Sequence, residues 1–370
     1  MMFVDSNEKH LPLLDGIRGL LAMWVFVGHL ARTVGFSFPF ISRPGLAVDF
    51  FMLISGFLMM WHWMPREHKY QSFSHQSVDF YIRRVFRISP VYYFALTIVI
   101  LFPALFISAK QEIGASVGNI IGVSSYDTSL QNVFFHFTYI FGLFPNYAQN
   151  NPLPDWSISL EMQFYFVFPM LVLVFKKINP IALAVMMYPV ALAVNSCIGT
   201  PNDPGKWLTY PQPSLLPMRI SVFLAGMSLA EVCRLYPLKT DRWVSCFLAF
   251  SLFLAPLDKY VIFGSLFLCV LIYAGRNRVS MLLQSPPLRY LGDLSYGVYL
   301  FHIPVMMISL FLITKFIHFQ NMSPIVRFVF SICAITPPLL FVSYIIHVCI
   351  EKPGIHVGRQ LSQFLLPKRQ

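Results

Sequence analysis

Ten apolar stretches of roughly membrane-spanning length constrain the fold of this chain more than any other feature. Of its 370 residues, 56% are hydrophobic and only 12% are charged, and a mean hydropathy of +0.64 excludes an ordinary soluble domain. Lipid offers backbone polar groups no partner, so such stretches must be helical. We therefore expect an all-α fold, a polytopic integral membrane bundle with about ten transmembrane helices. The ten predicted spans are 12–33, 46–63, 89–108, 158–175, 179–197, 215–233, 243–256, 260–274, 291–314 and 325–350.

Lysine and arginine residues are distributed unevenly between the two ends of these spans. If the N-terminus is cytoplasmic, eighteen of them flank cytoplasmic ends and seven flank outer ends, with Arg18 and Arg219 left inside spans. Because positive residues gather on the cytoplasmic side, this asymmetry predicts that both termini are cytoplasmic. The net charge of +11 then reflects membrane topology, and nucleic acid is not an expected partner.

The organisation of the chain is simple. We detect no cleavable signal peptide, internal repeat or metal-ligand spacing, and the six cysteines are interpreted as small apolar packing residues. Residues 1–370 are expected to form a single membrane domain with no appended soluble domain, in a bacterial inner membrane, with no bound metal. The longest polar connection, 109–157, faces outward and contains an aromatic run, 133–143, that is a candidate for dipping into the bilayer. The oligomeric state is left open, and a homo-oligomer is compatible with the sequence.

Two strongly polar side chains interrupt the first span. Arg18 and His29 are eleven residues apart, which is about 16 Å along a helix and within roughly 20° of three full turns, so both project from one face. Asp15 shares that face. Polar side chains inside a span usually serve a function, although an arginine near a helix end also snorkels to the headgroups and a lone histidine also packs in cores. On this pair alone both interpretations stay open.

Three arginines precede the third predicted span. Arg83, Arg84 and Arg87 are expected in a cytoplasmic stretch, where spacings of three and four put Arg87 beside both others on one helical face. Such a cluster suits phosphate groups, because the planar guanidinium fork binds their oxygens in pairs. Membrane anchoring by positive residues is the simpler explanation from these residues alone.

Two acids open spans from the outer side. Glu161 has Ser157 one turn before it and Tyr165 one turn after it, and Asp49 begins the second span. His29 should lie at a similar depth, and a neutral imidazole near a carboxylate is a competent general base. Helix capping is the alternative role for both acids. The neighbouring Trp156 is also explained by an interfacial aromatic belt.

Five sequence segments follow one another in a characteristic order along nearly the whole chain. They are Leu14-Asp15-Gly16-Ile17-Arg18-Gly19 followed by His29; Val48-Asp49-Phe50-Phe51 leading to Ser55-Gly56-Phe57; Arg83-Arg84-Val85-Phe86-Arg87-Ile88-Ser89-Pro90; Trp156-Ser157-Ile158-Ser159-Leu160-Glu161 leading to Phe164-Tyr165 and Pro169; and Leu291-Gly292-Asp293-Leu294-Ser295-Tyr296 leading to Tyr299-Leu300 and His302. With a closing Tyr344…Glu351-Lys352-Pro353, this series resembles the membrane acyltransferase-3 family, whose members are O-acyltransferases of surface glycans and related acceptors. The departures from the family pattern are Ala47, where a glycine is usual, and Phe301 before His302.

The resemblance implies a cytoplasmic acyl-CoA donor and an acceptor hydroxyl presented from the outer side. Acetyl-CoA is the expected donor because acetyl is the family's commonest group, and a surface polysaccharide is the expected acceptor, ahead of a lipid-linked sugar or a small secreted metabolite. The implied catalytic residues are His29, Glu161 and Asp49. The implied coenzyme-binding residues are Arg18, Arg83, Arg84, Arg87 and Asp15. The implied substrate-site residues are Trp156, Ser157, Tyr165, Ser295, Tyr296, Tyr299 and His302.

Span 291–314 contributes a polar stripe to this scheme. Ser295, Tyr299 and His302 fall at i, i+4 and i+7 and should face protein or water. Tyrosine hydroxyls here are candidate donors to a thioester oxygen, although bonds between helices are their commoner use. His302 competes with His29 for the role of base, and we prefer His29 because it shares a helix with an arginine.

Direct acyl transfer and a covalent acyl-histidine both remain open. A secondary transporter of a small anionic or acylated solute is the alternative function, disfavoured because inverted repeats and paired broken helices are not detected. A non-catalytic scaffold has no need for arginine and histidine in register inside a span.

Overall fold

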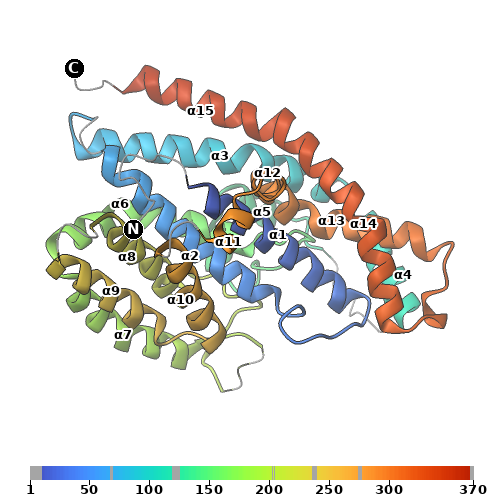
Figure 1. The fold of residues 1–370 in the computed structure, drawn as a ribbon. Coiled ribbons are helices and arrows are strands. Elements are labelled where there is room, and N and C mark those ends of the chain that lie inside the picture. Colours follow the sequence, from blue (N-terminus) through green and yellow to red (C-terminus); the bar gives the residue numbers. More distant parts are fainter. Residues whose placement is uncertain are drawn as a thin grey trace.

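The chain forms a helical bundle, described here from a computed structural model for residues 11–66, 70–118, 126–201, 203, 205–235, 240–273 and 277–366 (Figure 1). Short 3-10 or π turns and one two-residue parallel ladder, Ile198 opposite Leu208 and Gly199 opposite Thr209, complete it. The helices are α1 Pro12–Thr33, α2 Pro44–Trp63, α3 Phe73–Leu101, α4 Pro103–Val117, α5 Leu130–Phe137, α6 Trp156–Lys177, α7 Pro180–Cys197, α8 Ile220–Leu235, α9 Thr240–Leu254, α10 Lys259–Tyr273, α11 Arg278–Leu283, α12 Pro286–Asp293, α13 Ser295–Thr314, α14 Pro324–Ile346 and α15 Lys352–Leu365. The short elements are η1 Met64–Arg66, η2 Ile140–Leu143, η3 Leu216–Met218, η4 Phe319–Asn321, the π turn η5 His347–Glu351, and strands β1 Ile198–Gly199 and β2 Leu208–Thr209.

The all-α membrane architecture is confirmed, with a smaller number of long helices than predicted. Within the described ranges, seven helices are long and apolar enough to cross a membrane. The predicted spans 215–233, 243–256 and 260–274 are also helical, but α8, α9 and α10 have only 16, 15 and 15 residues. Helices of that length rise about 23 Å, which is less than a hydrocarbon core of about 30 Å. The count of ten therefore becomes seven full-length helices with three shorter ones packed among them.

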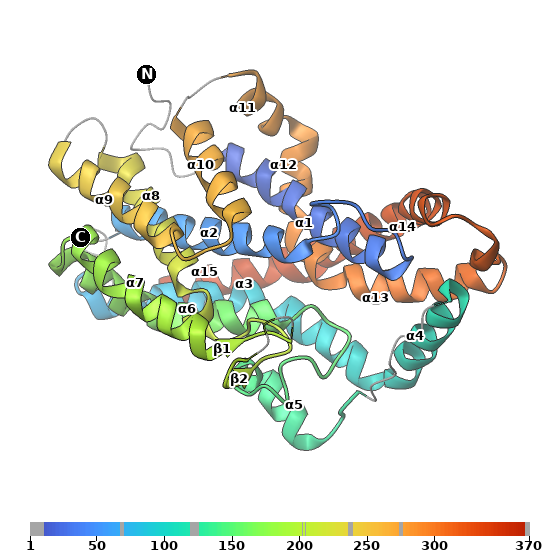
Figure 2. The ribbon, with the colours of Figure 1, turned by 90° about the horizontal axis from the view of Figure 1, so that it is seen from below.

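Helices α2 and α8 pack at backbone distance. A Cβ atom on Gly56 would lie 2.2 Å from the Phe223 carbonyl oxygen, and one on Gly226 would lie 2.1 Å from the Leu53 carbonyl oxygen. Small residues permit such close approach between membrane helices. The contact holds α2 centrally, with α1 on one side of it and α6 on the other (Figure 2).

The first turns of α1 are held by α11 and α12. A Cβ atom on Gly292 would lie 2.1 Å from the Asp15 carbonyl oxygen, and one on Gly16 would lie 1.9 Å from the Leu283 carbonyl oxygen. These contacts position the segment of α1 that carries Asp15 and Arg18.

Helix α14 continues through η5 into α15, which runs alongside α3 (Figure 1). Gly354 and Gly358 of α15 pack on Phe86 of α3. Farther along, the Ser362 hydroxyl donates a hydrogen bond to the buried Asp79 carboxylate of α3. The C-terminal helix thus braces the half of α3 that holds the predicted arginine cluster.

Candidate active site

The three clustered arginines lie inside α3, which begins at Phe73, and not in a stretch before the third span. Their environments differ. The Arg83 Nε donates to the Asp79 carboxylate at 2.5 Å, and Arg66 reaches the same carboxylate at 3.3 Å. Arg84 stacks over the rings of Phe80 and Tyr165, 5.6 and 5.5 Å from their centroids. All three arginines lie in one continuous helix, as their spacing requires for a shared face, but Arg83 is already paired with a carboxylate.

Arg18 is the point where the first helix meets these groups. It interacts electrostatically with Arg87 of α3 and with the carboxylates of Asp15, Glu351 and Glu161. Two of these partners come from α6 and from η5, so four segments converge around one guanidinium. Glu351 is itself buried and lies 2.8 Å from Nδ1 of His347. The sequence interpretation did not include Glu351 or His347, although Glu351 stood in the closing motif.

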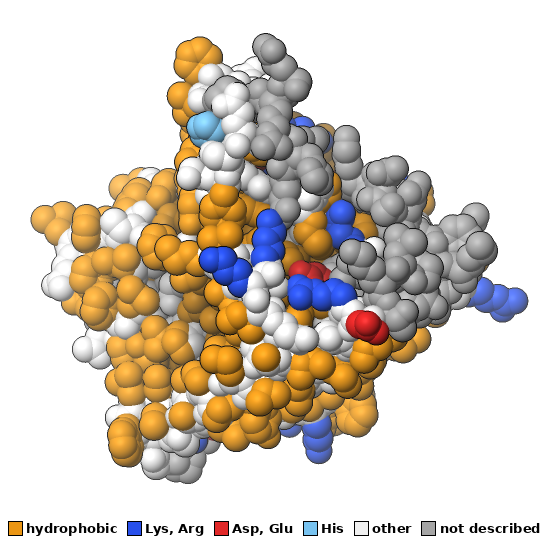
Figure 3. All heavy atoms as spheres, turned by 90° about the vertical axis from the view of Figure 1, so that its left-hand side faces the viewer, with side chains coloured by type: hydrophobic (Ala, Val, Ile, Leu, Met, Phe, Trp, Pro, Cys, Tyr) orange, Lys and Arg blue, Asp and Glu red, His pale blue; other side chains and the backbone are white. Residues whose placement is uncertain are grey.

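Figure 3 shows the end of the molecule at which α2 ends and α3 begins. Basic side chains gather near the centre of this face around acidic ones, and hydrophobic side chains surround them. The part of α3 nearest this end carries Arg83, Arg84 and Arg87. A polyanion approaching this end of the bundle would meet that positive charge first.

Glu161 is held by hydroxyl groups from two helices. The Tyr165 hydroxyl donates to its carboxylate at 2.6 Å and the Ser55 hydroxyl donates at 3.1 Å. Ser55 lies on α2, so the interaction joins α2 to α6. Ser55 was quoted in the family motif but was not predicted as a site residue.

Tyr299 connects α13 to the start of α6. Its hydroxyl group donates to the Pro154 carbonyl at 2.9 Å and lies 2.6 Å from the Ser157 hydroxyl oxygen. Because a carbonyl only accepts, the Tyr299 hydrogen points to Pro154 and the Ser157 hydroxyl donates to Tyr299. Tyr296 similarly donates to the Ile88 carbonyl at 2.9 Å. These tyrosine hydrogens are engaged by the protein, so the predicted role as donors to a thioester oxygen is not supported.

The two candidate histidines lie side by side. The ring centroids of His29 and His302 are 5.2 Å apart. His302 is fully buried, whereas His29 is partly exposed. The packing of α1 against α13 thus brings the two candidate bases to one place, which the sequence interpretation did not predict.

Several of the polar side chains in this region are partly exposed although the helices that carry them are packed in the bundle. Polar groups within a span face protein or water and not lipid, so these side chains belong to the polar interior of the bundle. Their partners Tyr165, Tyr299 and His302 are buried. The partly exposed residues are Arg18, His29, Ser55, Arg87, Ser157 and Glu161.

Asp49 is paired elsewhere. Its carboxylate accepts a hydrogen bond from Nε of Arg219 on the loop before α8 at 2.8 Å. Both side chains line a small cavity together with Asn195, Ser221 and Asp258. The predicted partnership of Asp49 with His29 is therefore not seen, and the sequence interpretation had left Arg219 without a role.

The remaining predicted residues line or support the same region. Trp156 is partly buried and packs against the main hydrophobic core. Ser295 is buried, and no partner for its hydroxyl oxygen is found in the described part of the chain. The expectation that Ser295, Tyr299 and His302 face the protein interior is confirmed, because all three are buried.

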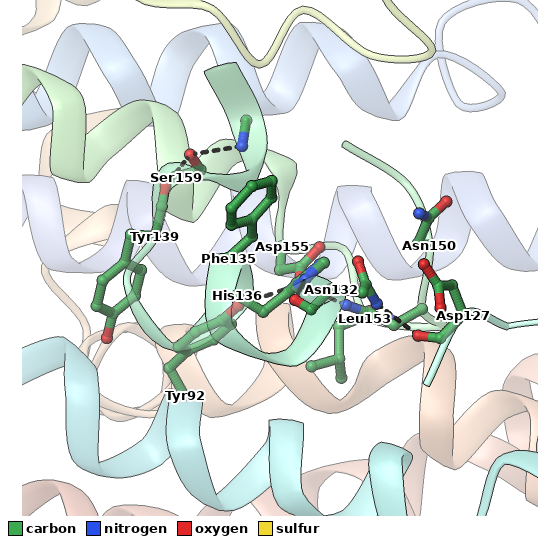
Figure 4. Close-up of polar contacts among 12 residues, drawn as sticks. Tyr92, Asp127, Asn132, Phe135, His136, Tyr139, Asn150, Leu153, Asp155 and Ser159 are labelled. Atoms are coloured by element: carbon green, nitrogen blue, oxygen red, sulfur yellow. Dashed lines mark hydrogen bonds and ion pairs between the residues drawn. The ribbon is translucent and has the colours of Figure 1, made fainter. Parts of the chain in front are cut away.

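The start of α6 is fixed by a buried polar network (Figure 4). Asp155 accepts hydrogen bonds from Tyr92 at 3.2 Å and Asn151 at 2.8 Å, and its carboxylate lies 3.6 Å from Nε2 of His136. Burial raises the pKa of Asp155, and His136 is the strongest opposing influence. This network positions Pro154 and Ser157, the two partners of Tyr299. Within the run 133–143, His136 and Phe141 are buried in the protein, whereas Phe134, Phe137 and Leu143 are exposed.

Comparison with known protein families identifies the family of this chain. Residues 11–347 match the family model described as an acyltransferase domain, Acyl_transf_3. The chain therefore belongs to the acyltransferase 3 family of polytopic membrane proteins.

Two bacterial relatives illustrate the similarity. The peptidoglycan O-acetyltransferase OatA of Listeria monocytogenes is 26% identical over 337 residues, covering 82% of this chain and 50% of the relative. The O-acetyltransferase OatA of Staphylococcus aureus is 24% identical over 331 residues, covering 81% of this chain and 51% of the relative. The chain spans about half the length of these curated relatives. No solved structure matches it significantly.

Proposed function

We propose that this chain is an O-acyltransferase that moves an acetyl group from cytoplasmic acetyl-CoA to a hydroxyl of an extracytoplasmic glycan. The observation that carries the proposal is that four different helices bring Arg18, Arg87, Glu161, Tyr299 and His29 into the interior of the bundle, and we take these side chains to line one polar path. The named activity of the relatives supports acetyl transfer, and the Listeria protein's name supports a cell-wall glycan as the acceptor class. The setting is a bacterial inner membrane, with both termini cytoplasmic.

The donor would bind with its phosphates on Arg18, Arg84 and Arg87. Arg83 is excluded from direct contact because the Asp79 carboxylate already holds it. Guanidinium groups bind phosphate oxygens through paired, charge-assisted hydrogen bonds. Arg18 and His29 are separated by about 16 Å along α1, so the extended pantetheine arm would carry the thioester from the phosphate end to the imidazole.

The chemistry follows from general base catalysis at His29. An unprotonated ring nitrogen takes the proton of the acceptor hydroxyl while the oxygen attacks the thioester carbonyl. The tetrahedral intermediate then collapses, the carbon–sulfur bond breaks, and the imidazolium returns the proton to the departing coenzyme A sulfur. Glu161 is held by Ser55 and Tyr165 and interacts electrostatically with Arg18, and we assign it to the catalytic group with His29.

The test is a pair of variants on one helix. We expect His29→Ala to lower acetyl transfer by about 10²–10⁴-fold while acetyl-CoA binding is kept. Arg18→Ala should lose donor binding instead. Calorimetry measures donor binding, and release of free coenzyme A by purified protein in liposomes measures turnover. Full turnover by His29→Ala, or unchanged donor affinity in Arg18→Ala, would refute these assignments.

A further inference from the structure

We propose that His302 is a positioning residue for His29, acting as a neutral hydrogen-bond acceptor behind it. The inference rests on the proposed function, because it concerns the orientation of the proposed base. It goes beyond that function by giving the second histidine a defined protonation state and a defined partner.

The tautomer of His302 follows from its contacts. Its Nδ1 lies 2.6 Å from the Tyr299 carbonyl oxygen. A carbonyl oxygen only accepts, so Nδ1 must carry the hydrogen. In a neutral ring the other nitrogen, Nε2, then has a free lone pair and no hydrogen.

That lone pair has no partner in the described residues. Nε2 of His302 is buried and unbonded, and the residue as a whole is 0% exposed. A buried acceptor without a donor is costly, so such an atom calls for an explanation. The nearest aromatic nitrogen heterocycle is the His29 ring, whose centroid is 5.2 Å away.

His29 can supply the missing donor. Among the described residues, no hydrogen bond to either ring nitrogen of His29 is found, and His29 is partly exposed. One N–H of His29 directed to Nε2 of His302 leaves the opposite nitrogen unprotonated and facing the acceptor. In the same way, a hydrogen-bond acceptor next to one ring nitrogen of a catalytic histidine fixes the proton on that nitrogen and leaves the other nitrogen free to act as the base.

The proton transfers of one catalytic cycle balance without a further reactant. The acceptor proton moves to the free nitrogen of His29, and the N–H directed to His302 becomes one of two N–H groups of the imidazolium. His302 neither gains nor loses a proton. When the proton passes to the departing sulfur, both rings return to their starting state.

Two amide variants separate positioning from a structural role. His302→Asn places an amide where it can still donate to the Tyr299 carbonyl, but it removes the acceptor at the Nε2 position. His302→Gln extends a carbonyl oxygen toward the Nε2 position and gives up the shorter bond to Tyr299. We expect His302→Gln to keep most of the parent kcat and His302→Asn to lose on the order of 10- to 100-fold, with the KM for acetyl-CoA unchanged in both.

The reverse order, with His302→Asn at least as active as His302→Gln, would show that the bond to Tyr299 is what matters and would overturn the proposal. His356→Asn, an exposed site on α15, is the matched control and should retain parent activity. If His29→Ala itself remains active, the proposed function fails, and that result is independent of the ranking of the two amides.

Nitrogen-15 NMR of histidine-labelled protein tests the tautomer without reference to activity. The His302 signals are assigned by their loss in His302→Asn. We expect a protonated Nδ1, an unprotonated Nε2, and a shift of the Nε2 signal in His29→Ala. A protonated Nε2, or signals unchanged by His29→Ala, would exclude the arrangement even if both amide variants were inactive.

Discussion

At the residue scale, the site depends on which polar groups are already engaged by the protein. Arg83 donates a hydrogen bond to the Asp79 carboxylate, and Arg219 donates one to the Asp49 carboxylate. The Tyr299 hydroxyl donates to the Pro154 carbonyl. These groups hold helices together, and the remaining groups are available to ligands. The type of a residue therefore makes it a candidate for ligand binding. Its hydrogen-bond partners in the structure then show whether the side chain is available to a ligand or holds two helices together.

The two arginines of α3 should separate these roles. We expect Arg87→Ala to weaken acetyl-CoA binding, because it removes a charge-assisted phosphate contact worth about 1.5–3 kcal/mol. Arg83→Ala should leave donor affinity nearly unchanged and lower thermal stability, since a buried carboxylate loses a partner. Calorimetry and thermal unfolding in detergent measure the two effects. The assignment is wrong if the two variants behave alike in both measurements.

At the element scale, glycine contacts decide which helices lie close enough to share a site. Gly56 and Gly226 join α2 to α8, and Gly16 and Gly292 join the start of α1 to α11 and α12. In each contact, a backbone carbonyl group of the neighbouring helix occupies the space that a side chain at the glycine position would need. The position of Ser55 beside Glu161 and the position of Arg18 beside Arg87 both depend on such contacts.

Gly226→Ala tests the α2–α8 contact. The added methyl group would lie 2.1 Å from the Leu53 carbonyl oxygen, so the helices must separate, and overpacking of this kind typically costs about 1–3 kcal/mol. Thermal unfolding should occur at a lower temperature. Gly45→Ala is the control, because a Cβ atom there meets nothing within 4 Å, and its stability should be equal or slightly higher. Equal unfolding temperatures for the two variants would contradict the packing described here.

At the scale of the whole molecule, helix direction determines which end of the polar path meets which compartment. The arginines of α3 lie toward the end where α2 ends, whereas the Asp49 cavity lies at the end where α2 begins. The charge bias of eighteen to seven assigns the arginine end to the cytoplasm. This assignment matches a cytoplasmic donor with an outer acceptor.

A reporter fused after Gln370 tests that orientation. An enzyme active only outside the cytoplasm should give no signal, and one active only inside should give a strong signal. The same reporters placed in the connection after Thr33 should give the opposite result. Activity of the external reporter at Gln370 would reverse the side of every residue in the proposed mechanism.

The membrane class, the position of most long helices and the sharing of one face by Arg18 and His29 were predictable from the sequence, because they depend on composition and on helical periodicity within one element. The exception is α3, predicted at 89–108 but found at Phe73–Leu101, because its first turns carry charged residues and do not stand out by hydropathy. Periodicity also placed Ser295, Tyr299 and His302 on one inward stripe. It placed the start of α8 five residues too early, because residues 215–218, just before this helix, are also apolar.

The neighbours of each helix were decided only by the tertiary structure. His302 lies beside His29 and Asp49 is paired with Arg219, and the two residues of each pair come from elements far apart in the sequence. Contacts between helices depend on shape, such as a glycine against a carbonyl, and a single sequence does not encode that complementarity in any local pattern. The residues of the candidate site could therefore be nominated from the chain, whereas their pairing required the packed bundle.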